Sequence, residues 1–142
     1  MSAELAKVVA LLRELDATLV NVGHGRGDRS VAQAEEFIRF WCDSGGELGA
    51  VVSWPNTAAS WLRPACRFAA GAPDAWVVAA EPQEWCGFGP RLVATGSWRP
   101  GRTVAFSGLA GLSTGIDGVR GATEDGAGWM FFDGRLVVDR WS

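Results

Sequence analysis

The sequence has few of the residues that build metal sites, disulfide frameworks and nucleic-acid interfaces. It contains one histidine and three cysteines without a Cys-x-x-Cys pair, so we expect no metal site. The odd number of cysteines favours free thiols in a reducing compartment. Lys7 is the only lysine, and the net charge of −3 gives no reason to expect a nucleic-acid partner, because polyanion binding needs clustered positive charge.

A long apolar run is missing from the start of the chain as well. Glu4, Lys7, Arg13 and Glu14 interrupt the apolar pattern there, which excludes a signal-peptide core and a membrane span in that segment. We therefore expect a cytoplasmic protein with no membrane partner. The 142 residues are 48% hydrophobic and 20% charged, which is typical of one globular domain over 1–142.

Four short apolar runs alternate with segments of helical pattern. The runs cover Thr18–Val22, Leu48–Ser53, Ala75–Ala80 and Thr103–Ser107. Continuous apolar runs separated by helices are typical of a parallel sheet that is covered on both faces. The sequence therefore predicts an α/β fold of three layers, in which helices cover both faces of a mostly parallel sheet of about four strands.

Several helix boundaries follow from local signals. An amphipathic helix is expected over residues 2–15. Ser30 and Gln33 form a possible capping box at the start of the second helix. The third helix is expected over 58–69, where Pro64 kinks or restarts it because proline lacks an N–H.

The second half of the chain is harder to divide. A fourth helix begins at Gln83 or only at Pro90, and the glycine-rich residues 108–127 are expected to be mostly loop. Asp133-Gly134 is a two-residue turn signal between apolar segments, so residues 128–139 are predicted to form a β-hairpin. This hairpin either extends the sheet or is appended to it.

Three pieces of the first 80 residues share a pattern with a known family. They are a glycine-turn strand and helix ending in Gly45-Gly46-Glu47, a strand closing on Trp54-Pro55, and the segment 73–79, which reads Pro-Asp-Ala-Trp-Val-Val-Ala. With them, residues 18–80 resemble the second half of type 1 periplasmic binding proteins, the fold of branched-chain amino acid receptors. Those receptors have two lobes, whereas this chain has the length of about one. The resemblance implies a single lobe that binds a small molecule.

The segment Gly23–Arg29 is the first candidate site. It follows a strand and precedes a helix, where bare backbone N–H groups favour an anion. Gly23 and Gly25 would expose those groups, and Arg26 and Arg29 would bind a carboxylate or phosphate. The spacing matches neither the dinucleotide fingerprint nor a nucleotide-hydrolase loop, so no cofactor is expected. The alternative is a tight, exposed turn.

A second group of candidates follows the next two strands. Trp54 and Trp85 would lie at the ligand crevice of a doubly wound sheet and flank the body of a ligand. Asn56 and Glu84, beside these indoles, are predicted to contact the same ligand. The alternative is that both tryptophans pack against the sheet.

Cys86 offers an enzymatic alternative. It follows the third strand near a possible helix start, where a thiolate would be stabilised. His24 would act as its base and Glu81 or Glu84 would orient the histidine, giving a thiol-dependent hydrolase. The other interpretation is an inert thiol.

Three functions therefore remain open. The first is a module that binds an amino-acid-like or anionic small molecule, and the second is the thiol-dependent enzyme. The third is protein–protein contact or homodimerisation, in which the C-terminal hairpin adds a strand to a partner.

Overall fold

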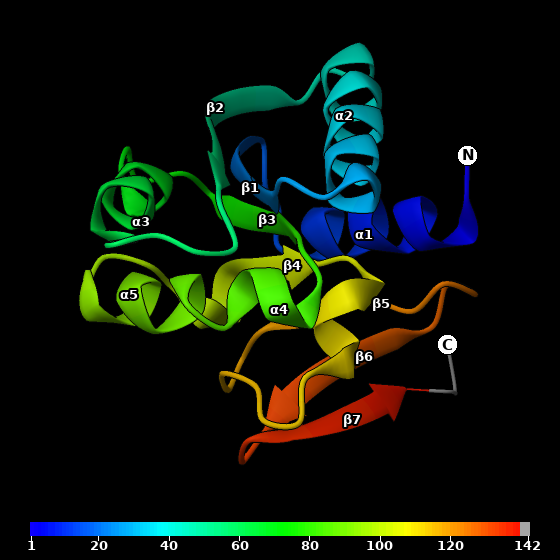
Figure 1. Ribbon diagram of the computed structural model, residues 1–142. Coiled ribbons are helices and arrows are strands. Elements are labelled where there is room, and N and C mark those ends of the chain that lie inside the picture. The colour runs from blue at the N-terminus through cyan, green and yellow to red at the C-terminus, as the bar shows by residue number, and fades with distance from the viewer. Residues whose placement is uncertain (140–142) are drawn as a thin grey trace.

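The computed structural model describes residues 1–139, whose strands form one mixed sheet of seven strands (Figure 1). The strand order is β2-β1-β3-β4-β5-β6-β7, and the pairs from β2 to β5 are parallel. The strands are β1 (Leu19–Gly25), β2 (Glu47–Trp54), β3 (Ala75–Ala79), β4 (Thr103–Ala105), β5 (Arg120–Ala122), β6 (Gly128–Phe132) and β7 (Arg135–Asp139).

The number of strands corrects the prediction of about four. The four predicted strands are present and parallel, but β5 adds a fifth parallel strand inside the expected loop 108–127. Its three residues, Arg-Gly-Ala, are too few to show a strand period. The predicted hairpin forms at 128–139 and pairs antiparallel with β5, so it extends the sheet.

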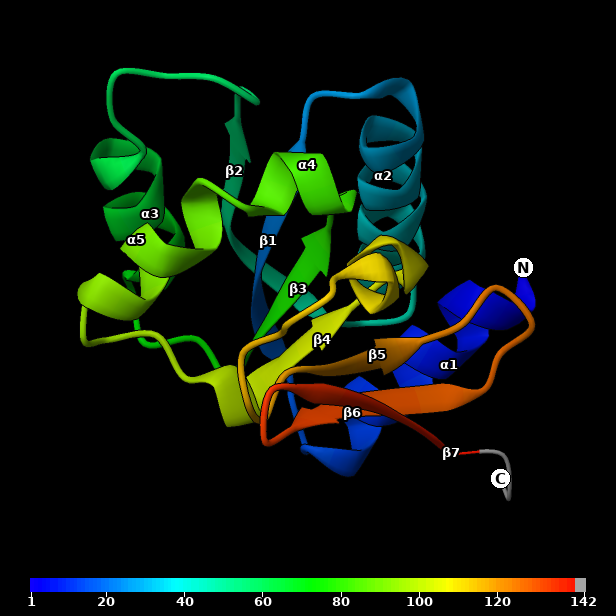
Figure 2. The ribbon, with the colours of Figure 1, turned by 60° about the horizontal axis from the view of Figure 1, so that its bottom comes forward.

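Helices cover both faces of the sheet, as the apolar runs predicted (Figures 1 and 2). Helices α1 and α2 pack on one face, and α3, α4 and α5 pack on the other. The α-helices are α1 (Ala3–Glu14), α2 (Asp28–Asp43), α3 (Leu62–Ala69), α4 (Pro82–Trp85) and α5 (Phe88–Ala94), and η1 (Pro100–Arg102) and η2 (Ser107–Gly111) are short 3₁₀ turns. Within residues 1–139 no helix combines the length and the apolar character needed to cross a bilayer.

The central strand β3 shows why the runs are apolar throughout. All five of its residues are buried. Trp76 and Val78 point into the core beneath α3 and α5, whereas Ala75, Val77 and Ala79 point into the core beneath α1 and α2. Successive side chains of a strand alternate between faces, so a strand covered on both faces has no polar positions.

Two helix starts differ from the expected ones. Helix α2 begins at Asp28, with Gly27 as its N-cap, and Ser30 lies inside the first turn. The capping box of Ser30 and Gln33 is therefore wrong, because a side chain from another element occupies the helix start. Helix α3 begins only at Leu62, so Pro64 lies in its first turn, where a missing N–H costs no helical hydrogen bond.

The connections between the strands identify where a ligand crevice is expected, at the carboxyl edge of the sheet. From β1 the chain crosses through α2 to β2 on one side, and from β3 it crosses through α4 and α5 to β4 on the other. His24 near the end of β1 is level with Ala79 at the end of β3. Ligands of doubly wound sheets bind where the connections from two neighbouring parallel strands lead to opposite sides, which here is between the turns that follow β1 and β3.

Candidate functional site

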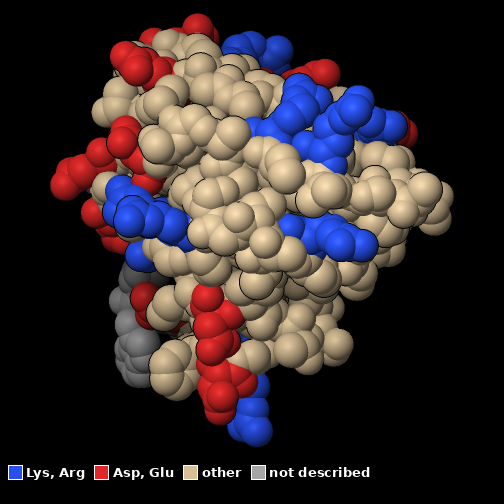
Figure 3. All heavy atoms as spheres, turned by 90° about the vertical axis from the view of Figure 1, so that its left-hand side faces the viewer, with Lys and Arg blue, Asp and Glu red and all other residues tan. Residues whose placement is uncertain are grey.

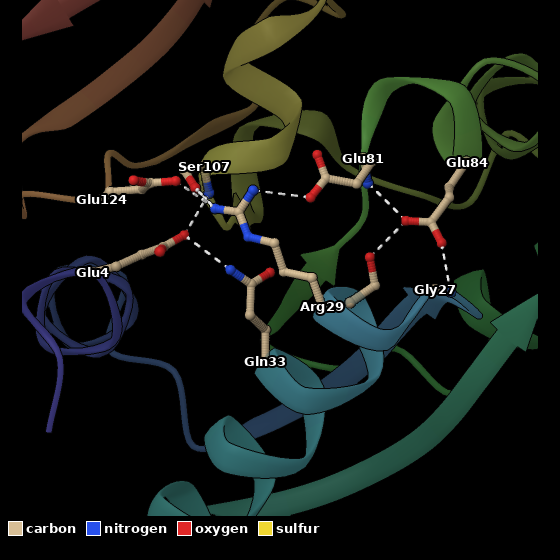
Figure 4. A network of polar contacts seen from close by, with 9 residues as sticks. Glu4, Gly27, Arg29, Gln33, Glu81, Glu84, Ser107 and Glu124 are labelled. Carbon is tan, nitrogen blue, oxygen red and sulfur yellow. Dashed lines mark hydrogen bonds and ion pairs between the residues drawn. The ribbon is translucent and has the colours of Figure 1, made fainter.

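The crevice position is filled by the carboxylate of Glu84, the N3 residue of α4 (Figure 4). Glu84 Oε2 accepts a hydrogen bond from Gly27 N at 2.8 Å, and Oε1 accepts from Ser30 Oγ at 2.5 Å and from Glu81 N at 2.8 Å. Only 2% of the residue is exposed. A carboxylate from the first turn of α4 therefore caps helix α2, whose Ser30 lies 54 residues earlier in the sequence.

The local sequence positions this carboxylate from both sides. Pro82 at the first position of α4 and Glu81 at its N-cap start the helix, and Glu84 closes a capping box with the Glu81 backbone. At the end of β1, a Cβ at Gly25 would overlap the Glu84 carboxyl group. Gly25 is thus required for a close approach. The Glu84 carbonyl oxygen is fixed as well, because it accepts from Trp54 Nε1 at 2.6 Å.

The surroundings of Glu84 favour its charged form. Burial alone would raise the pKa of this carboxyl group, because it disfavours charge. The three hydrogen bonds, above all the one from Ser30, and the neighbouring His24 outweigh burial and hold the pKa of Glu84 below its ordinary value of 4.5. The group at the helix start is therefore a stably ionised carboxylate at neutral pH.

Arg29 is engaged by acidic partners from its own chain. Its Nη1 lies 3.0 Å from Glu81 Oε1, and its Nη2 lies 2.8 Å from both Ser107 Oγ and Glu124 Oε1 (Figure 4). Glu4 of α1 accepts a hydrogen bond from Ser107 N at 2.7 Å. The first turn of α2 is thereby joined to the turns after β3, β4 and β5.

The predicted anion-binding turn is shorter than expected. Strand β1 continues through Gly25, so only Arg26 and Gly27 connect it to α2. Gly23 is buried within the strand, and Arg26 is exposed, with its Nε donating to Ser53 Oγ at 3.3 Å. One backbone N–H group of the turn, that of Gly27, is already occupied, because it donates to the carboxylate of Glu84.

The two predicted ligand-flanking indoles are part of the core. Trp54 has no exposed surface, and its ring stacks on Phe88 with 3.7 Å between centroids. Trp85 is 4% exposed and meets Trp54 edge to face. Asn56 is exposed in the loop after β2. In this conformation Trp54 offers no surface to a ligand, whereas Trp85 borders the hollow described below.

The three residues of the thiol-dependent alternative are not joined. Cys86 is exposed, His24 Nδ1 lies 2.7 Å from the Gly25 carbonyl oxygen, and Glu81 binds Arg29. In the described part of the chain, no hydrogen bond links Cys86 to His24 or His24 to Glu81. The proposed roles of these residues stay predictions.

A hollow of about 390 Å³ lies beside Trp85, between the α4–α5 corner and the segment that follows η2. We call it the Trp85 pocket. Its walls belong to the connections that follow β3 and β4, and none of its lining side chains is charged. The lining consists of Trp85, Cys86, Pro90, Val93, Leu112, Thr114 and Ile116.

The surface formed by α3 and α5 is basic, although the chain as a whole is acidic (Figure 3). Arg63 and Arg67 lie on α3 and Arg91 lies on α5, and residues 55–73 and 85–101 contain no Asp or Glu. The acidic side chains are therefore concentrated elsewhere, for example on α2 and along the carboxyl edge of the sheet.

Comparison with known proteins identifies a fold and no family. No family model matches the sequence, and no curated protein does. The crystal structure of a substrate-binding periplasmic protein from Ralstonia solanacearum is similar, with a TM-score of 0.55 and 15% sequence identity over 72% of this chain. The match covers 28% of that protein, so this chain spans little more than a quarter of its length. The likeness supports a fold that weakly resembles a periplasmic binding protein.

Several residues of the site carry no signal in the sequence. Ser30 and Glu124 look like ordinary polar positions, and Glu4 reads as a solvated residue on an amphipathic helix. The motif Glu81-Pro82-x-Glu84 does predict a capped helix start, but not that its carboxylate also caps α2. Leu112 and Ile116 of the Trp85 pocket lie in a loop without periodicity.

Proposed function

We propose that this chain is a small-molecule binding module built on a single lobe like those of periplasmic binding proteins, with its ligand in the Trp85 pocket. The observation that carries the proposal is the pocket itself, an uncharged hollow between the α4–α5 segment and the segment after η2. These two segments belong to the connections that leave the carboxyl ends of β3 and β4, and such sheets bind ligands among the segments that follow their strand ends. The fold likeness supports the same class of function, since the similar protein is named as substrate-binding.

The lining favours a neutral and largely apolar ligand. A hollow of about 390 Å³ lies within the usual range for small-molecule sites. Aliphatic side chains and the Trp85 indole form most of its wall, while Thr114 and Cys86 supply the polar atoms. A charged ligand group would lose its hydration there without gaining a partner.

The competing version keeps the type 1 receptor ligand, an amino acid or other anion, at Arg26 and Arg29. Less supports it. The Gly27 N–H group already binds Glu84, and the Arg29 guanidinium already binds Glu81 and Glu124. An incoming anion would have to displace carboxylates that the chain holds at high effective concentration.

Methyl NMR distinguishes the two sites. Indole, cyclohexanol, leucine and inorganic phosphate would be titrated separately while the methyl resonances of Val93, Leu112 and Ile116 and the backbone amides of residues 25–30 are followed. We expect indole or cyclohexanol to shift the three methyl groups. Shifts confined to residues 25–30, or no shift with any probe, would contradict the proposal.

Two matched variants test whether the pocket is responsible. Val93 lines the pocket and Leu62 lies on α3 away from it. Both residues are 52% exposed, so we expect the fold to accept a glutamate at either position. Val93→Glu should weaken binding at least about tenfold, because a charge enters the apolar wall. Leu62→Glu should leave binding unchanged, and equal effects of both variants would exclude the pocket as the site.

Labelling of Cys86 gives an independent measure. Cys42, Cys66 and Cys86 are all exposed, but among the three only Cys86 lines the pocket. Bound indole or cyclohexanol should slow the reaction of Cys86 with iodoacetamide and leave the other two rates unchanged. Equal protection of all three thiols, or of none, would argue against a ligand beside Trp85.

A further inference from the structure

The outer strand of the hairpin presents an open edge of the sheet. Strand β7 pairs with β6 on one side and ends the strand order on the other. The hairpin also carries four of the eight large apolar side chains that are exposed in residues 1–139, namely Met130, Phe132, Leu136 and Val137. An apolar edge strand with free backbone groups is the usual template for pairing with another strand.

The turn geometry shows which backbone groups face outward. Phe132 and Arg135 flank the two-residue turn and pair with each other. In such hairpins the flanking pair exchanges hydrogen bonds, and the bonded pairs then alternate along the ladder. Arg135, Val137 and Asp139 therefore direct their N–H and C=O groups towards β6, whereas Leu136 and Val138 direct theirs to the open edge.

We infer that β7 pairs antiparallel with β7 of a second copy of this chain, centred on Val137. In this register Leu136 of each copy lies opposite Val138 of the other, so the outward backbone groups of both residues are satisfied. Val137 lies opposite its own counterpart. Bonded and non-bonded pairs alternate without a break, so the register required by the backbone is also symmetric.

The charges of β7 agree with this register. Its sequence is Arg-Leu-Val-Val-Asp, which places a cation and an anion at equal distances from Val137. Antiparallel pairing about Val137 puts Arg135 of each copy opposite Asp139 of the other, as a non-hydrogen-bonded pair whose side chains are close. Parallel pairing in register would oppose like charges, so the strand specifies antiparallel pairing by charge as well as by backbone.

Such pairing would bring together the apolar side chains on one face of the two hairpins. Met130 lies beside Val137 on β6, and both line a hollow of about 280 Å³ between α1 and the hairpin. The twofold axis of an antiparallel strand pair is perpendicular to the sheet, so the same faces of the two copies adjoin. Met130, Phe132 and Val137 of both copies would then form one continuous apolar strip.

Sedimentation velocity over a concentration series tests the pairing through a charge swap. Arg135→Asp and Asp139→Arg each place like charges at both ends of the strand pair, so either should raise the dimer dissociation constant about tenfold. The double variant restores opposite charges and should restore the dimer. Leu136→Pro removes one outward N–H from each copy and should also weaken it, since edge strands tolerate such a proline.

The outcomes separate the second copy from other occupants of the edge. A dimer that is weakened by each single variant and restored by the double variant supports the inference. A monomer at millimolar concentration would overturn it and leave the edge to a strand of another protein. A dimer insensitive to all of these changes, or an assembly larger than a dimer, would overturn it too, because this pairing is closed.

Discussion

Replacing Glu84 by glutamine tests the contribution of this carboxylate to stability, because it exchanges one carboxylate oxygen for an NH2 group. The side chain keeps its size, so the core around Trp54 and Trp85 is not repacked. The introduced amide can keep a carbonyl oxygen where Oε1 accepts from Glu81 N and Ser30 Oγ. Its nitrogen then faces Gly27 N–H, so two donors oppose each other in a buried space.

The size of the effect follows from the three hydrogen bonds. A hydrogen bond to a charged group contributes about 1.5–3 kcal/mol, and a buried donor without a partner costs about 1–3 kcal/mol. Glutamine loses the bond from Gly27 entirely and keeps the other two as weaker, neutral bonds. We therefore expect Glu84→Gln to lower the free energy of unfolding by about 2–4 kcal/mol, a large part of the stability of a domain.

The loss should depend on pH in a defined direction. The pKa of Glu84 in the folded state lies below 4.5, its value in the absence of these contacts. A carboxyl group with a lowered folded pKa stabilises the fold above its unfolded pKa and loses this effect as pH falls towards the folded pKa. The difference between the two proteins should therefore be constant above about pH 5.5 and shrink below pH 4.5.

Urea unfolding at a series of pH values measures this difference. Subtracting the curves cancels other carboxyl groups, including Asp74, whose pKa is also lowered, mainly by hydrogen bonds from Leu19 N and Thr18 N. Glu36→Gln on the exposed side of α2 is the matched control and should change stability by less than about 0.5 kcal/mol. Equal losses for both variants, or a difference that grows on acidification, would refute the reasoning.

Two further predictions concern the same edge. Gly25→Ala should lower the free energy of unfolding by about 1–3 kcal/mol, because the added methyl group would overlap the Glu84 carboxylate. In a Glu84→Ala background the same change should lower it by less than about 1 kcal/mol, which a double-mutant cycle measured by urea unfolding would show. Arg29→Ala should lower the free energy of unfolding by less than about 1 kcal/mol, and this loss should shrink in high salt, because the Arg29 side chain is 45% exposed. A loss that is unchanged by salt would contradict this.

The sequence predicted the parts of the fold that depend on local patterns. Strand β3 is apolar at every position because both its faces are covered, and Asp133-Gly134 places the hairpin because both residues adopt positive φ. Strand β5 was missed because three residues cannot show a period. The order of strands, and with it the position of β7 at the open edge, depends on pairings that no local pattern reports.

The contacts of the site could not be predicted from the sequence. The turn after β1 was expected to bind an anionic ligand, but its Gly27 N–H binds the carboxylate of Glu84, a residue that was itself expected to face a ligand. That exchange depends on the distance between two turns in space. Likewise, Trp54 was predicted to follow the second strand, but it is the last residue of β2. Its indole turns into the core, because Phe88 of α5 offers a stacking surface that the sequence of β2 does not reveal.

The most direct measurement on the central claim is the pKa of Glu84 in the folded protein, followed through its side-chain carboxyl carbon by NMR during a pH titration. A midpoint below 4.5, accompanied by a shift of the Gly27 amide resonance at the same pH, is the result expected of a carboxylate that caps α2. A midpoint at or above 4.5 without a response from Gly27 would contradict the capping of α2 by Glu84.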